Sequence, residues 1–144
     1  MKQYHTKITI NSPLETVWTA LVDTENYPNW NPLVGKLEGN LAEGQTIKTY
    51  IIPLGNTYSP KIIAFVPYNQ LTWKGVQGAS FLMAGKHYYK LRKIDNQTTE
   101  LLHGEYFTGL FSFFIPKKLL QKMENAFLEH NKALKVLLEK NKNS

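Results

Sequence analysis

Two neighbouring motifs, Asn11-Ser-Pro-Leu-Glu-Thr-Val-Trp18 and Tyr27-Pro-Asn-Trp-Asn-Pro32, decide how the first quarter of the chain folds. In the first motif, Ser12 is a favoured helix N-cap, Pro13 suits the first helical position, and Glu15 completes a capping-box pattern. In the second motif, two prolines prevent a helix from continuing. Together the motifs predict two short helices that lead into a tight aromatic corner.

Strand patterns lie on both sides of these motifs. Residues 4–10 alternate between apolar and polar side chains, which is the period of a half-buried strand. Later segments rich in β-branched and aromatic residues, bounded by Gly, Asn or Pro, predict further strands at 33–39, 46–53, 60–67, 71–75, 82–94 and 98–108. Because no helical pattern separates these segments, we expect an antiparallel meander and not a parallel sheet.

The last part of the chain predicts one long amphipathic helix that opens at Pro116. Its stripe recurs at three- and four-residue steps: Leu119, Leu120, Met123, Phe127, Asn131, Leu134, Leu137 and Leu138. The predicted fold class is therefore α+β. A curved antiparallel sheet of six or seven strands wraps around the long C-terminal helix, two short helices follow the first strand, and residues 1–144 form a single domain.

Composition and charge narrow the function classes. The chain of 144 residues has no cysteine, which excludes disulfides and thiolate chemistry. Much of the net charge of +6 comes from lysines after Pro116, which we interpret as the solvated face of the helix. Because Arg92 is the single arginine, specific nucleic-acid recognition is not expected, whereas weak contact with an anionic membrane stays open. A polar N-terminus without an apolar run predicts a cytoplasmic protein.

This order of elements resembles the START-like, or SRPBCC, superfamily, which is best known from the birch pollen allergen. The resemblance covers nearly the whole chain and is carried by Ile8–Trp18, Tyr27–Pro32, Glu43-Gly44-Gln45, Leu71–Trp73, His87–Leu91 and His103–Gly109. It implies a helix-grip fold, with a large cavity between sheet and helix, and it favours the polyketide-cyclase-like branch. The dioxygenase branch carries cysteine ligands that this chain lacks, and the chaperone-activator branch has different strand patterns. Because the superfamily includes carriers and enzymes, the resemblance does not settle the activity.

Polar side chains gather on one face of the hairpin formed by residues 82–94 and 98–108. If residues 95–97 form a three-residue loop, the expected cross-strand pairs are Ile94–Thr98, Leu91–Leu101, Tyr89–His103 and His87–Glu105. The apolar residues Leu91, Leu101 and Phe107 on this face indicate that it is the inner one. Two histidines, a glutamate and a tyrosine are therefore expected together on the cavity wall.

Two interpretations of this polar group stay open. In the first, His87 and His103 have near-neutral pKa values, and Glu105 orients or ionises one of them, so that the group holds a ligand hydroxyl or carboxylate or moves protons on a polyketide-like enol. In the second, a buried His–Glu pair only fixes the sheet. The same residues are plausible metal ligands, but no supporting motif accompanies them, so neither a metal nor another cofactor is expected. His5 and His130 are interpreted as incidental.

The predicted cavity wall extends beyond the hairpin. The ligand-contact candidates are Trp18, Trp30, Trp73, His87, Tyr89, His103, Glu105, Phe107, Phe111, Met123 and Phe127. The apolar segment 110–115 either caps one end of the core or forms a mobile gate at the cavity mouth. A gate beside Lys117 and Lys118 would also suit docking at an anionic membrane.

These observations predict a protein that binds a hydrophobic or amphiphilic small molecule, lipid-like or polyketide-like, between the sheet and the C-terminal helix. One alternative is a polyketide cyclase or dehydratase that uses His87 or His103 with Glu105. A second alternative is a chaperone- or membrane-associated regulator that acts through the basic face of the helix.

Overall fold

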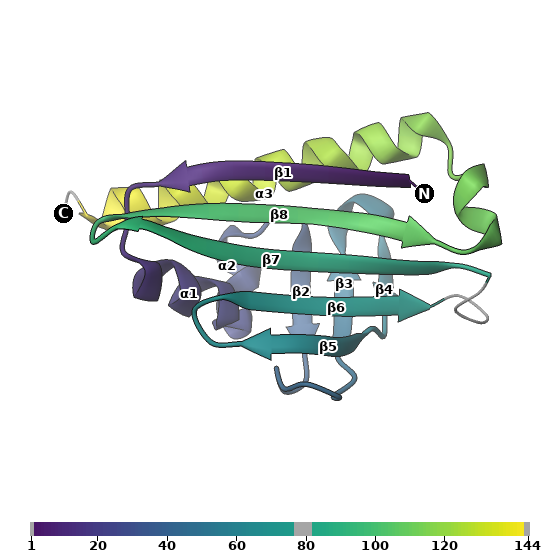
Figure 1. The fold of residues 1–144 in the computed structure, drawn as a ribbon, viewed down its shortest axis with the longest axis horizontal. Coiled ribbons are helices and arrows are strands. Elements are labelled where there is room, and N and C mark those ends of the chain that lie inside the picture. The colour runs from purple at the N-terminus through teal and green to yellow at the C-terminus, as the bar shows by residue number, and fades with distance from the viewer. Residues whose placement is uncertain (1, 77–81, 143–144) are drawn as a thin grey trace.

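A curved five-stranded antiparallel sheet runs along the helix α3 (Lys117–Lys142) in the computed structural model, which describes residues 2–76 and 82–142 (Figure 1). In spatial order its strands are β1 (Lys2–Ile10), β8 (Thr98–Thr108), β7 (Ala84–Asp95), β6 (Gln70–Val76) and β5 (Lys61–Val66). Because β1 pairs with β8, the first strand of the chain lies beside the last one. The predicted α+β helix-grip fold is confirmed.

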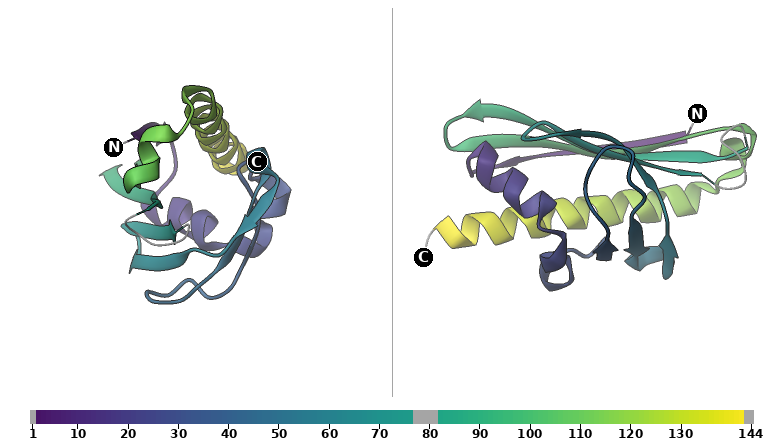
Figure 2. Two further views of the ribbon diagram at one scale, coloured as in Figure 1. Left: turned by 90° about the vertical axis from the view of Figure 1, so that its right-hand side faces the viewer. Right: turned by 90° about the horizontal axis from the view of Figure 1, so that it is seen from below.

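A second, three-stranded sheet contains β2 (Val34–Glu38), β3 (Lys48–Ile51) and β4 (Asn56–Tyr58). The single sheet of six or seven strands is thus divided, and the short strand β4 was not predicted. The helical segment after β1 carries the chain away from the first sheet, so that β2 pairs with β3 and not with β1. Seen along the molecule, the two sheets and α3 surround a common centre (Figure 2).

The two short helices that were expected after the first strand are confirmed. They are α1 (Leu14–Val22) and α2 (Tyr27–Trp30), with a 3₁₀ turn, η1 (Thr24–Asn26), between them. In the corner that follows, the Asn31 side-chain carbonyl accepts the backbone N–H groups of Leu33 and Val34, both at 2.9 Å. This buried amide fixes the turn into β2.

The expected capping box does not form. Helix α1 begins one residue later than predicted, with Pro13 as its N-cap residue and no side-chain cap. Ser12 is buried at the end of β1, where its N–H donates to the Ile10 carbonyl at 2.9 Å and its own carbonyl accepts from the Thr99 hydroxyl at 2.8 Å. Ser12 therefore joins the helix to the sheet, and the pattern was misread as local capping.

The register of the β7–β8 hairpin agrees with the prediction except at its tip. Leu91 opposes Leu101, Tyr89 opposes His103 and His87 opposes Glu105. The predicted Ile94–Thr98 pair is replaced by Asp95–Thr98, because a bulge at the end of β7 leaves a two-residue turn. The bulge absorbs one residue, so the error at the tip does not propagate along the strands.

Most of the predicted stripe on α3 is in the core. Met123, Phe127, Leu134 and Leu138 are buried, whereas Leu119 is 37% exposed. The same buried side of the helix carries two polar residues in succession, His130 and Asn131, with exposures of 0% and 1%. Two polar side chains at such depth require partners on the sheet.

A 3₁₀ segment, η3 (Leu110–Phe114), joins β8 to α3. Gly109 precedes it with φ of +98°, and a Cβ at this position would lie 2.6 Å from the Leu82 carbonyl, so no side chain is tolerated there. The segment leaves four large side chains in solvent, namely Leu110, Phe111, Phe113 and Phe114, with exposures of 63, 51, 65 and 77%. These four side chains do not cap the core, whereas Ile115 at the end of the predicted segment is half-buried and lines the cavity described below.

Candidate functional site

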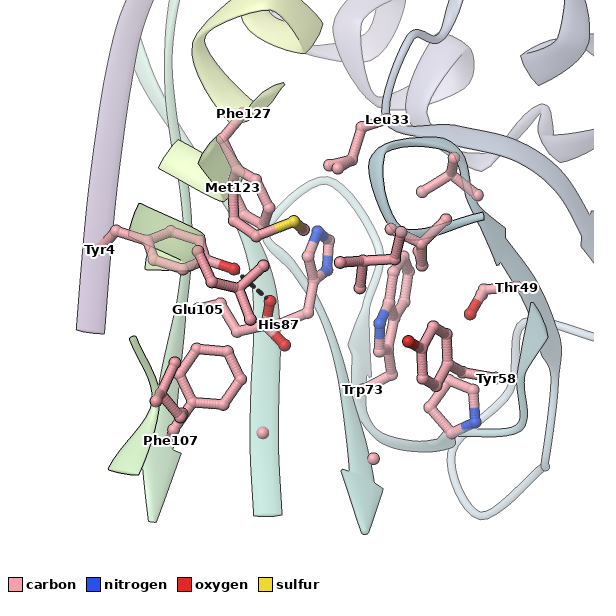
Figure 3. Close-up of a pocket in the computed structure, with 18 of the residues that line it drawn as sticks. Tyr4, Leu33, Thr49, Tyr58, Trp73, His87, Glu105, Phe107, Met123 and Phe127 are labelled. Atoms are coloured by element: carbon pink, nitrogen blue, oxygen red, sulfur yellow. Dashed lines mark hydrogen bonds between the residues drawn. The ribbon is translucent and has the colours of Figure 1, made fainter. Parts of the chain in front are cut away.

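A cavity of about 360 Å³ lies between the five-stranded sheet, the three-stranded sheet and the first turns of α3 (Figure 3). Its wall is mostly apolar and draws on all three elements, with Leu33, Val34, Ile51, Met83, Leu119 and Leu120 among the lining residues. The size and lining are those of a small-molecule site. Its polar groups are few, so each one restricts what can be bound.

The structure places six of the eleven ligand-contact candidates on this wall: Trp73, His87, Glu105, Phe107, Met123 and Phe127. The other five lie elsewhere. Trp18 packs on Phe65 beside the short helices, and Trp30 packs edge-on against the Tyr27 ring. Tyr89 and His103 are fully buried behind the cavity wall, and Phe111 is exposed on η3. Ligand contact by the six wall residues remains a prediction.

Behind the wall, a hydrogen-bonded cluster joins β1, β8 and α3. The Thr6 hydroxyl donates to the His103 carbonyl at 2.6 Å and accepts from the Asn131 amide nitrogen at 2.8 Å. The Asn131 carbonyl oxygen therefore faces the imidazoles, 2.9 Å from Nδ1 of His103 and 3.0 Å from Nδ1 of His130. Since this oxygen only accepts, both Nδ1 atoms carry protons.

The rest of the cluster follows from these tautomers. A neutral imidazole has one N–H proton, so Nε2 of His103 is an acceptor, and His87 Nε2–H donates a hydrogen bond to it at 2.8 Å. In the same way, Nε2 of His130 accepts from the Tyr89 hydroxyl at 3.0 Å. We call Thr6, Tyr89, His103, His130 and Asn131 the closed cluster, because their hydrogen bonds, together with the one from His87, occupy both ring nitrogens of His103 and His130. His87 links the closed cluster to the cavity.

The closed cluster corrects three expectations. First, the His–Glu pair is absent, because His87 bonds His103 and Glu105 bonds Tyr4. Second, the histidines do not have near-neutral pKa values. Burial, reinforced by the neighbouring imidazoles, lowers the pKa of His87 and His103 well below 6.5, and burial lowers that of His130 to about 4. Third, His130 is not incidental, since it ties α3 to the sheet.

Glu105 is the acidic residue of the cavity wall. The Tyr4 hydroxyl donates to its Oε1 at 2.6 Å, as Figure 3 shows, because Tyr4 and Glu105 are register partners on β1 and β8. Burial raises the pKa of Glu105 to about 7, although the bond from Tyr4 acts in the opposite direction. A carboxyl group that titrates near neutrality in an apolar cavity can hold or release a proton at physiological pH.

Aromatic stacking holds the polar residues in place. The rings of Trp73 and His87 stack with centroids 4.1 Å apart and planes within 10°. One layer deeper, His103 is stacked between Tyr89 and Phe127, at 4.4 and 4.2 Å. The His87 ring is therefore fixed by a stack on one side and by the His103 hydrogen bond at its tip.

Sequence reasoning missed four residues that define this region: Tyr4, Thr6, His130 and Asn131. Alternation along residues 4–10 placed Tyr4 and Thr6 on one face, but nothing local showed that β1 pairs with β8. Asn131 was in the predicted stripe, and a polar residue in such a stripe was the available signal of a buried partner. Among the described residues, no group of three His, Cys, Asp or Glu side chains is placed to hold a metal ion.

The sequence matches the family model described as polyketide cyclase / dehydrase and lipid transport over residues 1–135. The chain belongs to this family. No curated protein matches the sequence. Within the described part of the chain, none of the helices is both long and apolar enough to cross a membrane.

Solved structures share the family fold at low sequence identity. A hypothetical protein of Helicobacter pylori superposes with a TM-score of 0.78 at 15% identity, covering 95% of this chain and 88% of its own. An aromatase/cyclase of Streptomyces sp. R1128 superposes with a TM-score of 0.74 at 17% identity, covering 96% of this chain and 93% of its own. A START superfamily protein of Mycobacterium smegmatis superposes with a TM-score of 0.72 at 18% identity, covering 96% of this chain and 97% of its own. At these identities the likeness concerns the fold alone.

Proposed function

We propose that this protein binds a hydrophobic or amphiphilic small molecule, lipid-like or polyketide-like, in the cavity between its sheets and α3. The observation that carries the proposal is a mostly apolar space of about 360 Å³ whose wall holds a few polar side chains, with His87 and Glu105 the titratable pair on β7 and β8. Apolar burial supplies the affinity, and the two polar groups orient the bound molecule. Membership of a family that includes lipid transport supports the same function.

Native mass spectrometry with a panel of lipids and aromatic polyketide mimics tests this proposal. We expect one-to-one complexes that disappear in Met123→Trp, because the larger side chain fills the cavity. Val136→Trp is the matched control, since Val136 lies on the same helix but is 63% exposed. Complexes that survive in Met123→Trp, or no complex with any member of the panel, would contradict the proposal.

A second candidate function is a cyclase or dehydratase that uses Glu105. The observation that favours it is the pKa of Glu105, raised by burial to about 7 inside the cavity. Ionised Glu105 would take a proton from a carbon between two carbonyl groups, that carbon would attack a further carbonyl to close the ring, and protonated Glu105 would return the proton to the resulting alkoxide. Glu105 would then move a second proton from the same carbon to the new hydroxyl, which leaves as water while a carbon–carbon double bond forms. The fold is shared with an aromatase/cyclase of Streptomyces sp. R1128.

Turnover of a poly-β-ketone mimic, followed by chromatography, tests the enzymatic candidate. Glu105→Gln keeps an acceptor for the Tyr4 hydroxyl but cannot accept or release a proton, so we expect turnover to fall by a factor on the order of 100 or more. This candidate assigns the proton transfer to Glu105 and not to His103, the catalytic alternative from the sequence, because His103 is fully buried and is absent from the cavity lining. Unchanged turnover in Glu105→Gln would remove this residue from the mechanism.

We also propose that η3 docks on a membrane from which the cavity takes up its ligand. Its exposed Phe113 and Phe114 precede Lys117 and Lys118. Aromatic side chains beside lysines suit the interface of an anionic bilayer. Positive charge on the neighbouring strands at this end of the sheet also favours contact with an anionic membrane. Register partners on successive strands, Lys61, Lys74 and Lys86, form a row of like charges, which is an unfavourable arrangement without an anionic partner.

A further inference from the structure

Three buried side-chain atoms have no hydrogen-bond partner among the described residues: Trp30 Nε1, Asn31 Nδ2 and His87 Nδ1. Of the three residues, only His87 lines the cavity. An unpartnered polar atom in the protein interior is unfavourable, and in native structures it commonly marks a place where a ligand or water completes the bonding. The chemical group that can bond this nitrogen depends on whether Nδ1 of His87 carries a proton.

The hydrogen-bond directions in the closed cluster determine which nitrogen of His87 carries the proton. Thr6 fixes the orientation of the Asn131 amide, and that amide fixes the proton of His103 on Nδ1. His103 Nε2 then accepts, so His87 carries its proton on Nε2. The Nδ1 atom of His87 is left with a lone pair and no proton. It can accept a hydrogen bond and cannot donate one.

The charges on the cavity wall restrict the ligand further. No lysine or arginine is among the lining residues that the structure describes, and Glu105 is the charged side chain present. A carboxylate or phosphate in the cavity would lose its hydration without gaining a cation, and it would lie on the same wall as Glu105. A neutral group avoids both penalties.

We propose that the cavity selects neutral ligands whose polar end is a hydroxyl group that donates a hydrogen bond to Nδ1 of His87, and that it rejects carboxylates of the same size. This inference rests on the proposed binding function and adds the chemical class of the ligand. An alcohol, a phenol or an enol satisfies the requirement. A fatty acid in its ionised form does not, although its apolar part would match the wall equally well.

Isothermal titration calorimetry on the full-length protein at pH 7.5, with three probes of nearly equal size, tests the inference. The probes are 2-naphthol, which donates a hydrogen bond, 2-methoxynaphthalene, which does not, and 2-naphthoate, which is an anion. We expect 2-naphthol to bind about tenfold more tightly than the methyl ether and about 100-fold more tightly than the carboxylate. Decanol, decyl methyl ether and decanoate form a second set with a flexible apolar part.

The outcomes separate this inference from the proposed function. Equal affinity for 2-naphthol and its methyl ether, or tighter binding of 2-naphthoate, in both probe sets would overturn the hydroxyl preference while binding itself stands. Absence of binding by all six probes would overturn the proposed function, and the inference with it.

Two variants assign the preference to an atom. In His87→Phe, which keeps a ring that can stack on Trp73, the tenfold advantage of 2-naphthol over the ether is expected to vanish. In Glu105→Gln the rejection of 2-naphthoate is expected to weaken to about tenfold because the like charge is gone. An advantage that persists in folded His87→Phe would overturn the role of His87. If that variant does not fold, the comparison of probes on the unmodified protein still decides the hydroxyl preference.

Discussion

The β7–β8 hairpin carries two polar regions, which differ in whether other parts of the protein complete their hydrogen bonds. In the closed cluster, Tyr89 and His103 find partners on α3, where His130 and Asn131 complete the bonding. The next pair on this face, toward the start of β7 and the end of β8, is His87 and Glu105. These two residues line the cavity, and Nδ1 of His87 has no partner among the described residues. Neighbouring positions on one face are thus distinguished by what covers them. Polar residues that face the polar side chains of α3 serve stability, and those that face the cavity under its apolar first turns are available to a ligand.

The largest expected effect is loss of the closed cluster. His103→Leu removes the acceptor of the His87 Nε2 proton and one of the two donors to Asn131, at a site with 0% exposure. We expect the free energy of unfolding to fall by about 3 kcal/mol. Urea unfolding followed by circular dichroism measures it.

Glu105→Gln is the matched control for that measurement, because a glutamine oxygen still accepts the Tyr4 hydroxyl proton. Its free energy of unfolding is expected to stay at or above that of the unmodified protein, because glutamine places no charge in the buried site. Equal losses in the two variants would mean that the two regions do not differ in their structural role.

The second effect is a loss of stability in acid. The folded pKa values of His87, His103 and His130 lie below 6.5. Between these values and pH 6.5, the unfolded chain therefore binds more protons than the folded protein. Their contribution to stability is complete above about pH 6.5 and is lost as pH falls toward 4. Each histidine contributes up to roughly 1.4 kcal/mol per pH unit in this range. Urea unfolding at pH 7.5, 6.0 and 5.0 measures the slope.

Glu105 works in the opposite direction, which provides the control. Its folded pKa of about 7 lies above the unfolded value of 4.5, so it favours folding at low pH, and this contribution is lost as pH rises through 7. Glu105→Gln removes this compensation and should steepen the loss between pH 6.5 and 4.5. A flat profile in the unmodified protein would show that the histidines are not held neutral.

A smaller effect is expected from Gly85→Ala on the cavity wall. A Cβ there would lie 3.0 Å from Glu105 Oε2 and 3.0 Å from the Phe107 ring, so these two side chains must shift toward the cavity. We expect a loss of at most about 1 kcal/mol in the free energy of unfolding, together with roughly tenfold weaker binding of 2-naphthol. Unchanged affinity would indicate that the ligand does not reach this part of the wall.

The smallest effect on stability is expected at η3. Phe113 and Phe114 are 65% and 77% exposed, so the double variant Phe113→Ser/Phe114→Ser should change the free energy of unfolding by no more than about 0.5 kcal/mol. Sedimentation with vesicles that contain phosphatidylserine should nevertheless decrease several-fold. Val136→Ser, an exposed apolar site on α3, is the control. Equal sedimentation of all three proteins would exclude η3 as the docking segment.

What the sequence predicted, and what it did not, follows from the distance in sequence between contacting residues. The β7–β8 register was predictable because alternation and turn chemistry act within one hairpin, and a single bulge limited the error to its tip. Tyr4 bonds a residue 101 positions away, and Asn131 bonds one 125 positions away. No local pattern specifies such contacts. Hence the histidines and glutamate were placed on the correct face, but with the wrong hydrogen-bond partners.

The contact between β1 and α3 has a consequence for how the protein is made. Thr6 and Asn131 lie near opposite ends of the chain, so the cluster that orients His87 is completed only when α3 packs against β1. Contacts of such long sequence separation form slowly, because the intervening chain must first be ordered. During synthesis, a ribosome-bound chain that lacks α3 has the strands of the cavity but not its selectivity. Ligand recognition therefore begins with the last helix to emerge.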